Sequence, residues 1–353
     1  KKISSQSSDV EETITPFVKN ILIRLKMDEE QALKVSKLII QSDLYGVDTH
    51  GIFRLPNYVK RITEGGMNMN PNIKVIKERK STALLDGDNG IGHFIMHKAA
   101  KLAIKKAAKT GVAWVGVKNS NHAGAGATYA MMSLKKNMVG IYLAVGSANH
   151  LPPWGGIDML LSTNPIAIAI PAKSRPPIIL DMATTNTSYG KVKLAASNNK
   201  AMPIGWMQDK EGNPITNPKN ADKGFLIPIG GPKGYGLALM IGILAGTING
   251  AAFGKDVVNF NSDFKTTTNT GHVLIALDIE AFMPFETFTN EIDNIWNVMK
   301  SSRKMDGYSD IRLPGENRHF LYEKNIKQGI EINNNTILRL NEMANTLNVP
   351  III

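Results

Sequence analysis

The chain has 353 residues, of which 43% are hydrophobic and 20% are charged, and this balance excludes a disordered or fibrous protein. It contains no cysteine, which excludes disulfide frameworks, thiol nucleophiles and cysteine-ligated metal sites, and we expect a reducing, cytoplasmic compartment. The formal net charge is +11, but no long basic run occurs and the lysines are spread along helix-like segments. Solvated helix faces are therefore favoured over a nucleic-acid-binding surface.

The N-terminal part of the chain shows apolar residues at helical spacing. The pattern predicts helices over residues 9–26 and 28–45, the second of which begins with an acidic turn at Asp28. A polar loop follows, and a short helix is expected at residues 57–62, ending at Gly65-Gly66. This part of the chain is thus predicted to be helical.

From about residue 74 onwards, strand and helix patterns alternate. Strands are expected at residues 82–87, 112–117 and 138–145, with a helix at 93–111 and another at 127–138. Further strands are expected at 167–172, 177–183 and 272–282, further helices at 288–302 and 333–347, and irregular structure at 199–232. The alternation predicts an α/β fold.

One stretch, residues 234–254, is uncharged and has a glycine at every fourth position from Gly242 to Gly254. Its length could just span a bilayer, and the glycine spacing resembles a membrane packing motif. It stands alone, however, and contains Asn249 and no aromatic belt. We therefore expect a buried core helix over residues 236–254 and no membrane association.

The turn that follows the strand at 112–117 is a candidate for chemistry. Residues 124–129 partly match the dinucleotide-binding pattern G-x-G-x-x-G, but the third glycine is absent and no acidic residue ends the next strand. His122 precedes this turn, where a helix N-terminus disfavours imidazolium and would keep the ring neutral. His122 is either an acid/base group or a solvated loop histidine.

Two other histidine patterns have spacings found in binding sites. His93 and His97 have metal-ligand spacing but lack the glutamate of H-E-x-x-H, so no metal site is predicted. His50 and Arg54 lie four residues apart in a loop and could together hold a small carboxylate. Their spacing alone favours a histidine at a helix end and a surface arginine.

Longer segments carry a resemblance that spans about residues 10–345. They are SDLYGVDTHGIFRLPNYVKRITEGG, NSNHAGAG, PWGGIDMLLSTNPIAIAIP, ILDMATTNTSYGKV, MPIGWMQDKEGNPITNP, GPKGYGLAL and RLPGE. On these motifs the chain resembles the malate/L-lactate dehydrogenase family, which is unrelated to the Rossmann-type lactate and malate dehydrogenases. The resemblance implies a non-Rossmann, mixed-sheet NAD(P)-binding α/β domain together with a helical domain built from both ends of the chain.

The resemblance also implies a division of the chain. Residues 1–75 would form the helical N-terminal part of a substrate and dimerisation domain. Residues 76–302 would form the central NAD(P)-binding domain, with an irregular, partly helical insertion near 185–255. Residues 303–353 would return to the first domain.

The family's functional residues are carried over by motif. The histidine of the S-N-H turn makes His122 the expected acid/base, with His50 and Arg54 in the catalytic group. Thr49, which stands where serine is usual, would bind substrate with His50, Arg54 and Tyr58. The expected cofactor-binding residues are His50, Ser147, Asp181, Met182, Ala183, Lys233, Gly315 and Glu316.

The function implied is hydride transfer between NAD, or NADP, and a small 2-hydroxy or 2-oxo acid, with malate/oxaloacetate as the first choice. Ureidoglycolate, sulfolactate, lactate and the cyclic imino acid Δ1-piperideine-2-carboxylate are alternatives within the family. A non-catalytic ligand-binding protein or an RNA-binding scaffold is the alternative from another class. The resemblance further implies a homodimer with the active site near the subunit interface.

Overall fold

A mixed β-sheet forms the centre of the computed structural model, which describes residues 13–352. Its strand order is β1-β2-β3-β11-β4-β7-β8, and in this sheet β2 and β3 pair in parallel while the other neighbouring strands pair antiparallel. The strands are β1 (Lys74–Glu78), β2 (Thr82–Asp86), β3 (Val112–Ser120), β4 (Met138–Ala144), β7 (Ile166–Ile170), β8 (Ile178–Met182) and β11 (Thr270–Asp278). The expectation of a mixed-sheet α/β fold is confirmed.

Helix α5 (Gly92–Thr110) connects the two parallel strands β2 and β3. Its small residues Ala99, Ala100, Ala103 and Ala107 are buried in one hydrophobic cluster with side chains of the sheet. Short side chains at helical spacing let the helix approach the strands closely, so burial of apolar area fixes its position. The predicted helix at 93–111 is therefore confirmed.

The strand register brings several chain segments to one edge of the sheet. Ser120 at the end of β3 pairs with Thr270, and His272 two residues along β11 pairs with Ala144 at the end of β4. Met182 at the end of β8 is opposite Ile166 at the start of β7. The loops that follow β3, β4 and β8 consequently leave the sheet at the same edge.

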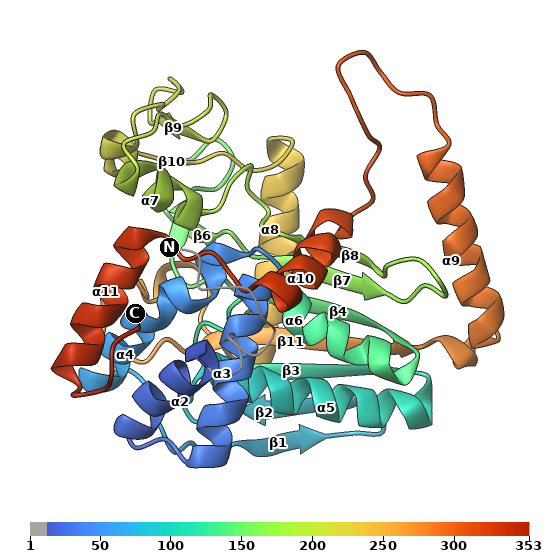
Figure 1. Ribbon diagram of the computed structural model, residues 1–353, viewed down its shortest axis with the longest axis horizontal. Helices are drawn as coiled ribbons and strands as arrows, with labels where there is room; N and C mark the ends of the chain where they lie inside the picture. The colour runs from blue at the N-terminus through green and yellow to red at the C-terminus, as the bar shows by residue number, and fades with distance from the viewer. Residues whose placement is uncertain (1–12, 353) are drawn as a thin grey trace.

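A helical layer flanks the sheet (Figure 1). It consists of α2 (Thr15–Arg24), α3 (Glu29–Leu44), α4 (Leu55–Thr63), α10 (Glu316–Gln328) and α11 (Asn334–Thr346). One hydrophobic cluster joins N-terminal residues such as Ile21 and Tyr58 to C-terminal residues such as Leu340. The two ends of the chain thus pack together, while the exact domain boundaries stay a prediction. The first predicted helix was to begin at residue 9, and residues 1–12 lie outside the described part.

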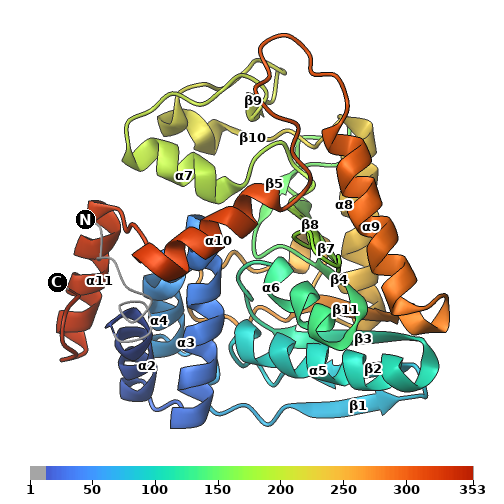
Figure 2. The same cartoon turned by 45° about the vertical axis from the view of Figure 1, so that its right-hand side comes forward.

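A third, smaller layer lies above the sheet edge and contains α7 (Tyr189–Ser197), β9 (Met207–Asp209) and β10 (Gly224–Leu226) (Figures 1 and 2). It has its own small core, which includes Val192, Met207 and Leu226. The two-stranded pair β9–β10 lies within residues 199–232, for which only irregular structure was expected. A second pair, β5 (Asn149–Leu151) with β6 (Leu161–Ser162), lies near the same layer.

The prediction of a buried helix over 236–254 is wrong in extent and in burial. Helix α8 covers Pro232–Ala245 and ends at Gly246, and Gly250 and Gly254 lie in turns with positive φ. Its buried side includes Ala238, Ile241 and Ala245, and Gly242 lies close to Phe253, since a Cβ there would come within 2.3 Å of that ring. On the opposite side Leu237, Met240 and Leu244 are exposed. Within residues 13–352, no helix is long and apolar enough to cross a membrane.

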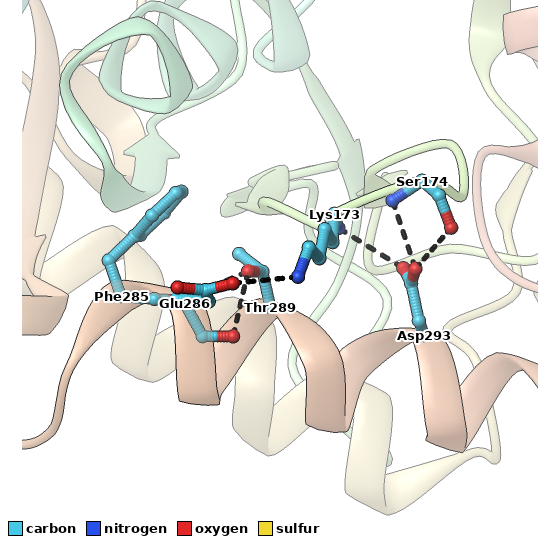
Figure 3. A network of polar contacts seen from close by, with 6 residues as sticks. All are labelled: Lys173, Ser174, Phe285, Glu286, Thr289 and Asp293. Carbon is cyan, nitrogen blue, oxygen red and sulfur yellow. Dashed lines mark hydrogen bonds and ion pairs between the residues drawn. The ribbon is translucent and has the colours of Figure 1, made fainter.

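Other boundaries also differ from expectation. Strand β11 ends at Asp278, where a short 3-10 turn begins, so the strand predicted to run to 282 is shorter. Helix α9 (Phe285–Lys300) starts three residues earlier than predicted, and α10 was not predicted. Asp293 on α9 accepts hydrogen bonds from the backbone N–H groups of Lys173 and Ser174, which fasten the β7–β8 turn to this outlying helix (Figure 3).

Candidate active site

A cavity of about 500 Å³ opens at the sheet edge where the loops after β3, β4 and β8 meet. Its lining includes loop residues His122, Ser147 and Ala183 from these three loops. The N-terminal loop contributes His50 and Arg54, and the small upper layer contributes Lys193. Ligand sites commonly lie in concave regions of this size, between layers that supply different side chains.

His122 lies in the cavity wall with one ring nitrogen engaged. Its Nδ1 is 2.7 Å from the hydroxyl of Tyr58 and accepts a hydrogen bond from the Gly124 backbone N–H at 3.3 Å. Within residues 13–352 no hydrogen bond engages Nε2, which leaves this nitrogen for a ligand. Burial, followed by the charge of Arg54, holds the His122 pKa well below its ordinary value. The ring is therefore neutral near pH 7, as a proton acceptor must be.

Tyr58 was expected to bind substrate, but it does not line the cavity. Its side chain is fully buried behind His122, on α4, and its ring also contacts Phe260 and His93. Because a phenol hydroxyl both donates and accepts, it can partner Nδ1 in either protonation state of the imidazole. The structure thus places Tyr58 on the side of His122 away from the cavity.

The loop of 49–54 brings a hydroxyl, an imidazole and a guanidinium to the cavity. The Thr49 hydroxyl is 2.9 Å from His50 Nδ1, and Arg54 Nε donates to the Thr49 carbonyl at 2.8 Å. The rings of His50 and His122 stack with centroids 5.7 Å apart. Burial lowers the His50 pKa to about 3, with Arg54 and Arg318 adding to the effect. Arg54 is consequently a charged group beside two neutral imidazoles, and its charge lowers the pKa of both rings.

The expected cofactor residues fall into two groups. Ser147, Asp181, Met182 and Ala183 line the cavity together with His50. Lys233, Gly315 and Glu316 do not line it. Lys233 is exposed at the first turn of α8. Gly315 packs on Ile179, and Glu316 is ion paired with Lys300 at 2.6 Å.

Several cavity residues were not assigned a role from the sequence. Arg318 on α10 pairs with Asp181 at 3.5 Å, and Asn261 accepts a hydrogen bond from Arg54 at 3.2 Å. Lys193 and His150 come from α7 and the β5 strand. None belongs to a local motif, and only the contacts between distant segments show their position.

The structure also decides between the interpretations of the glycine turn at 124–129 and of the histidine pair His93 and His97. The turn at 124–129 leads to α6 (Ala127–Ala130) and then to β4, which pairs antiparallel with β11 and not parallel with β3. It is therefore not a Rossmann βαβ turn. His93 is buried against Tyr58 with both nitrogens unpartnered. In the part of the chain that the structure describes, no group of three or more potential metal ligands occurs.

The comparisons with known proteins agree with this architecture. A family model described as malate/L-lactate dehydrogenase matches residues 10–341. The chain is 39% identical to a malate dehydrogenase of Pyrococcus abyssi, with 94% of this chain and 93% of that protein covered. It is 36% identical to the L-sulfolactate dehydrogenase of Methanocaldococcus jannaschii, covering 94% and 95%.

Solved structures give the same grouping. The crystal structure of malate dehydrogenase from Entamoeba histolytica superposes with a TM-score of 0.93 at 29% identity, covering 100% of both chains. The sulfolactate dehydrogenase structure from Methanocaldococcus jannaschii gives a TM-score of 0.87 at 34% identity, covering 98% of both chains. The similarity therefore extends over the full set of elements that surround the cavity.

Proposed function

The chain belongs to the malate/L-lactate dehydrogenase family and is an enzyme. On this premise we propose that it transfers a hydride between NAD and a small 2-hydroxy or 2-oxo acid. Malate/oxaloacetate is the first choice of substrate pair. The observation that carries the proposal is one cavity that holds a neutral histidine, His122, with a free Nε2, and a buried arginine, Arg54. A relative named ureidoglycolate dehydrogenase (NAD(+)), 31% identical, supports the choice of NAD.

The residues present fit a dinucleotide. Asp181 offers a carboxylate, which accepts hydrogen bonds from hydroxyl groups such as those of a ribose. Arg318 offers positive charge for a phosphate, and Ser147 offers a hydroxyl. A bound nicotinamide would supply the acceptance and donation of hydride. Ser147, Asp181, Met182 and Ala183 would hold it, with Arg318 added to the expected set.

The chain's own residues would bind the acid and move the proton. Arg54 would bind the C1 carboxylate with its guanidinium and so orient the C2 carbon. In oxidation His122 Nε2 accepts the proton of the C2 hydroxyl as the hydride leaves C2, and in reduction the imidazolium returns it to the carbonyl oxygen. For this step the neutral ring must carry its proton on Nδ1 and donate it to the Tyr58 hydroxyl, so the long 3.3 Å contact from the Gly124 N–H is given up. The imidazolium keeps the same Nδ1 bond, so Tyr58 would orient the ring in both states.

The quaternary structure is part of the same proposal. A homodimer is implied by the family resemblance, and an apolar stripe on α8 supports it. Leu237, Met240 and Leu244 recur at helical spacing and are exposed, by 37%, 51% and 37%. Contiguous exposed apolar residues commonly mark association surfaces. We further propose a cytoplasmic location, which the absence of cysteine supports.

The test is loss of NADH absorbance with oxaloacetate, pyruvate, sulfopyruvate and Δ1-piperideine-2-carboxylate, and NADH formation with ureidoglycolate. We expect turnover of oxaloacetate to be fastest and NADPH to be a poorer donor. Faster turnover of another acid would replace malate by that substrate. Binding of NADH without turnover of any acid would favour a non-catalytic ligand-binding protein.

A further inference from the structure

Two cations in the cavity share one neutral oxygen. Lys193 Nζ donates to the side-chain oxygen of Asn261 at 3.0 Å, and Arg54 Nη1 donates to the same oxygen at 3.2 Å. The two nitrogens thus lie no farther apart than the sum of these distances. Asn261 is itself held by Asn259, whose side-chain oxygen accepts the Asn261 backbone N–H at 2.9 Å. The pair of cations is therefore built into the fold by residues from three separate segments.

The positive charge at this point is not balanced by the protein. Among the residues that the structure describes, no carboxylate forms an ion pair with Lys193 or Arg54. Burial, together with the charges of Arg54 and Arg339, lowers the Lys193 pKa to about 8. Adjacent His150 is neutral near pH 7, since burial and Lys193 lower its pKa to about 4. Uncompensated cations in a partly desolvated cavity favour an anionic ligand.

A single carboxylate carries one negative charge and would leave the pair Arg54 and Lys193 with a net positive charge. A four-carbon 2-oxo acid such as oxaloacetate carries a second anionic group two bonds beyond the carbonyl carbon, and sulfopyruvate carries a sulfonate at the corresponding position. Pyruvate carries none. The arrangement of two neighbouring cations therefore distinguishes dianionic from monoanionic acids by charge.

We propose that Lys193 binds the distal anionic group of a dianionic 2-oxo or 2-hydroxy acid, while Arg54 binds its C1 carboxylate. This inference rests on the proposed function and adds the residue that selects the substrate class. His150 stacks on Tyr189 with ring centroids 4.1 Å apart and forms the wall beside Lys193. Asn261 sets the spacing of the two cations. The same chemistry would also suit a cofactor phosphate, and the experiment distinguishes the two.

The experiment compares Lys193→Met and Lys193→Arg with the wild-type enzyme, using oxaloacetate and pyruvate as substrates and varying NADH separately. A hydrogen bond between charged groups contributes substantially to the free energy of binding, so Lys193→Met should lower kcat/KM for oxaloacetate by roughly tenfold to hundredfold. The value for pyruvate should change by less than about threefold, because pyruvate has no distal charge. KM for NADH should stay constant, and Lys193→Arg should restore part of the preference.

Lys200→Met is the matched control, because Lys200 is exposed just beyond the end of α7 and does not line the cavity. It should behave like the wild type with both acids. Thermal unfolding checks that all variants are folded. An equal loss with oxaloacetate and pyruvate in Lys193→Met would overturn the inference, and a raised KM for NADH with an unchanged substrate preference would assign Lys193 to a cofactor phosphate instead.

The proposed function and this inference fail differently. A wild-type enzyme that reduces neither acid nor any other 2-oxo acid with NADH contradicts both. A wild-type enzyme that reduces pyruvate faster than oxaloacetate contradicts the role of Lys193 and leaves the family activity standing. If Lys193→Met keeps the preference for oxaloacetate, only the proposed role of Lys193 is contradicted.

Discussion

The Tyr58 hydroxyl lies 2.7 Å from Nδ1 of His122, so the candidate acid/base is anchored from behind by a residue 64 positions earlier in the chain. Tyr58 is fully buried on α4, whereas His122 follows β3. The helical layer and the sheet are thus connected through the ring that faces the cavity. A fixed ring orientation is what a proton transfer needs, because the transfer depends on the alignment of Nε2 with the substrate oxygen.

Removing the Tyr58 hydroxyl should impair this alignment. In Tyr58→Phe we expect kcat to fall by about tenfold to hundredfold in both directions, with KM for the acid changed little. Steady-state kinetics with oxaloacetate and malate measure the effect. Tyr322→Phe, whose ring stacks on Tyr45 and does not line the cavity, should remain at wild-type rate. A Tyr58→Phe enzyme with unchanged kcat would limit Tyr58 to packing.

Arg54 should be sensitive even to a conservative change. Arg54→Lys keeps the charge but loses the planar guanidinium that can contact a carboxylate with two nitrogens. We expect KM for the 2-oxo acid to rise and kcat/KM to fall by about tenfold or more, with NADH affinity unchanged. Arg79→Lys, at an exposed site, is the control. Wild-type kinetics of Arg54→Lys with every acid would show that Arg54 does not bind substrate.

The fold and the site were predictable where the information is local. The apolar period and the glycine at its end predicted α5, which buries one continuous face. The short apolar run at 112–117 predicted β3, whose two faces are both covered. Helix α10 escaped prediction because Glu316 is its single buried residue, so no apolar stripe marks it. The length of α8 was overestimated because glycines that form turns look like a packing face in sequence.

The same distinction applies to the cavity. His50, Arg54 and His122 stand in compact motifs that could be identified from the sequence alone. The contact between Lys193 and Asn261 spans 68 positions and that between Arg54 and Asn261 spans 207. Such pairs depend on how the layers pack, and no local pattern encodes them. Tyr58 was expected from the sequence to contact substrate. Its position behind His122 depends on how α4 packs against the sheet, which the sequence motif does not show.

The buried histidines should make stability depend on pH. Burial lowers the pKa of His50 and His93 to about 3 and of His97 and His272 to about 4, whereas an unfolded histidine titrates near 6.5. The unfolded state then binds more protons below pH 6.5, so the contribution of these histidines to the free energy of unfolding should be constant above this value and fall as the pH drops towards 4. Asp43, Asp48 and Asp181, whose pKa values burial raises, act in the opposite sense and partly offset the effect of the histidines.

Denaturant unfolding at pH 7.5, 6.0 and 5.0 measures this slope. Each histidine that is charged only in the unfolded state contributes about 1.4 kcal/mol per pH unit. His97→Gln, at a half-buried site outside the cavity, should make the slope shallower by one proton. A free energy of unfolding that is the same at pH 7.5 and 5.0 would show that these rings are protonated in the folded state.

The apolar stripe on α8 should hold a dimer together. Met240→Glu combined with Leu244→Glu places two charges in the centre of the stripe, and we expect the molar mass from light scattering to halve. Leu338→Glu, which changes an equally apolar and 60% exposed residue on α11, should leave the mass unchanged. A monomeric wild-type enzyme would contradict the dimer. A double variant that stays dimeric would show that the interface lies elsewhere.

The most direct test of the central claim is the kinetics of His122→Asn as a function of pH. Removal of a positioned acid/base commonly costs about 10²–10⁴-fold in rate, and we expect kcat to fall by this much while NADH still quenches protein fluorescence. Burial holds the His122 pKa well below 6.5, so the rate of malate oxidation by the wild type should decrease only below pH 6.5. This decrease on the acid side of the pH–rate profile, the acid limb, should be absent in the variant. A His122→Asn enzyme that keeps near-full turnover with the acid limb intact would contradict the account.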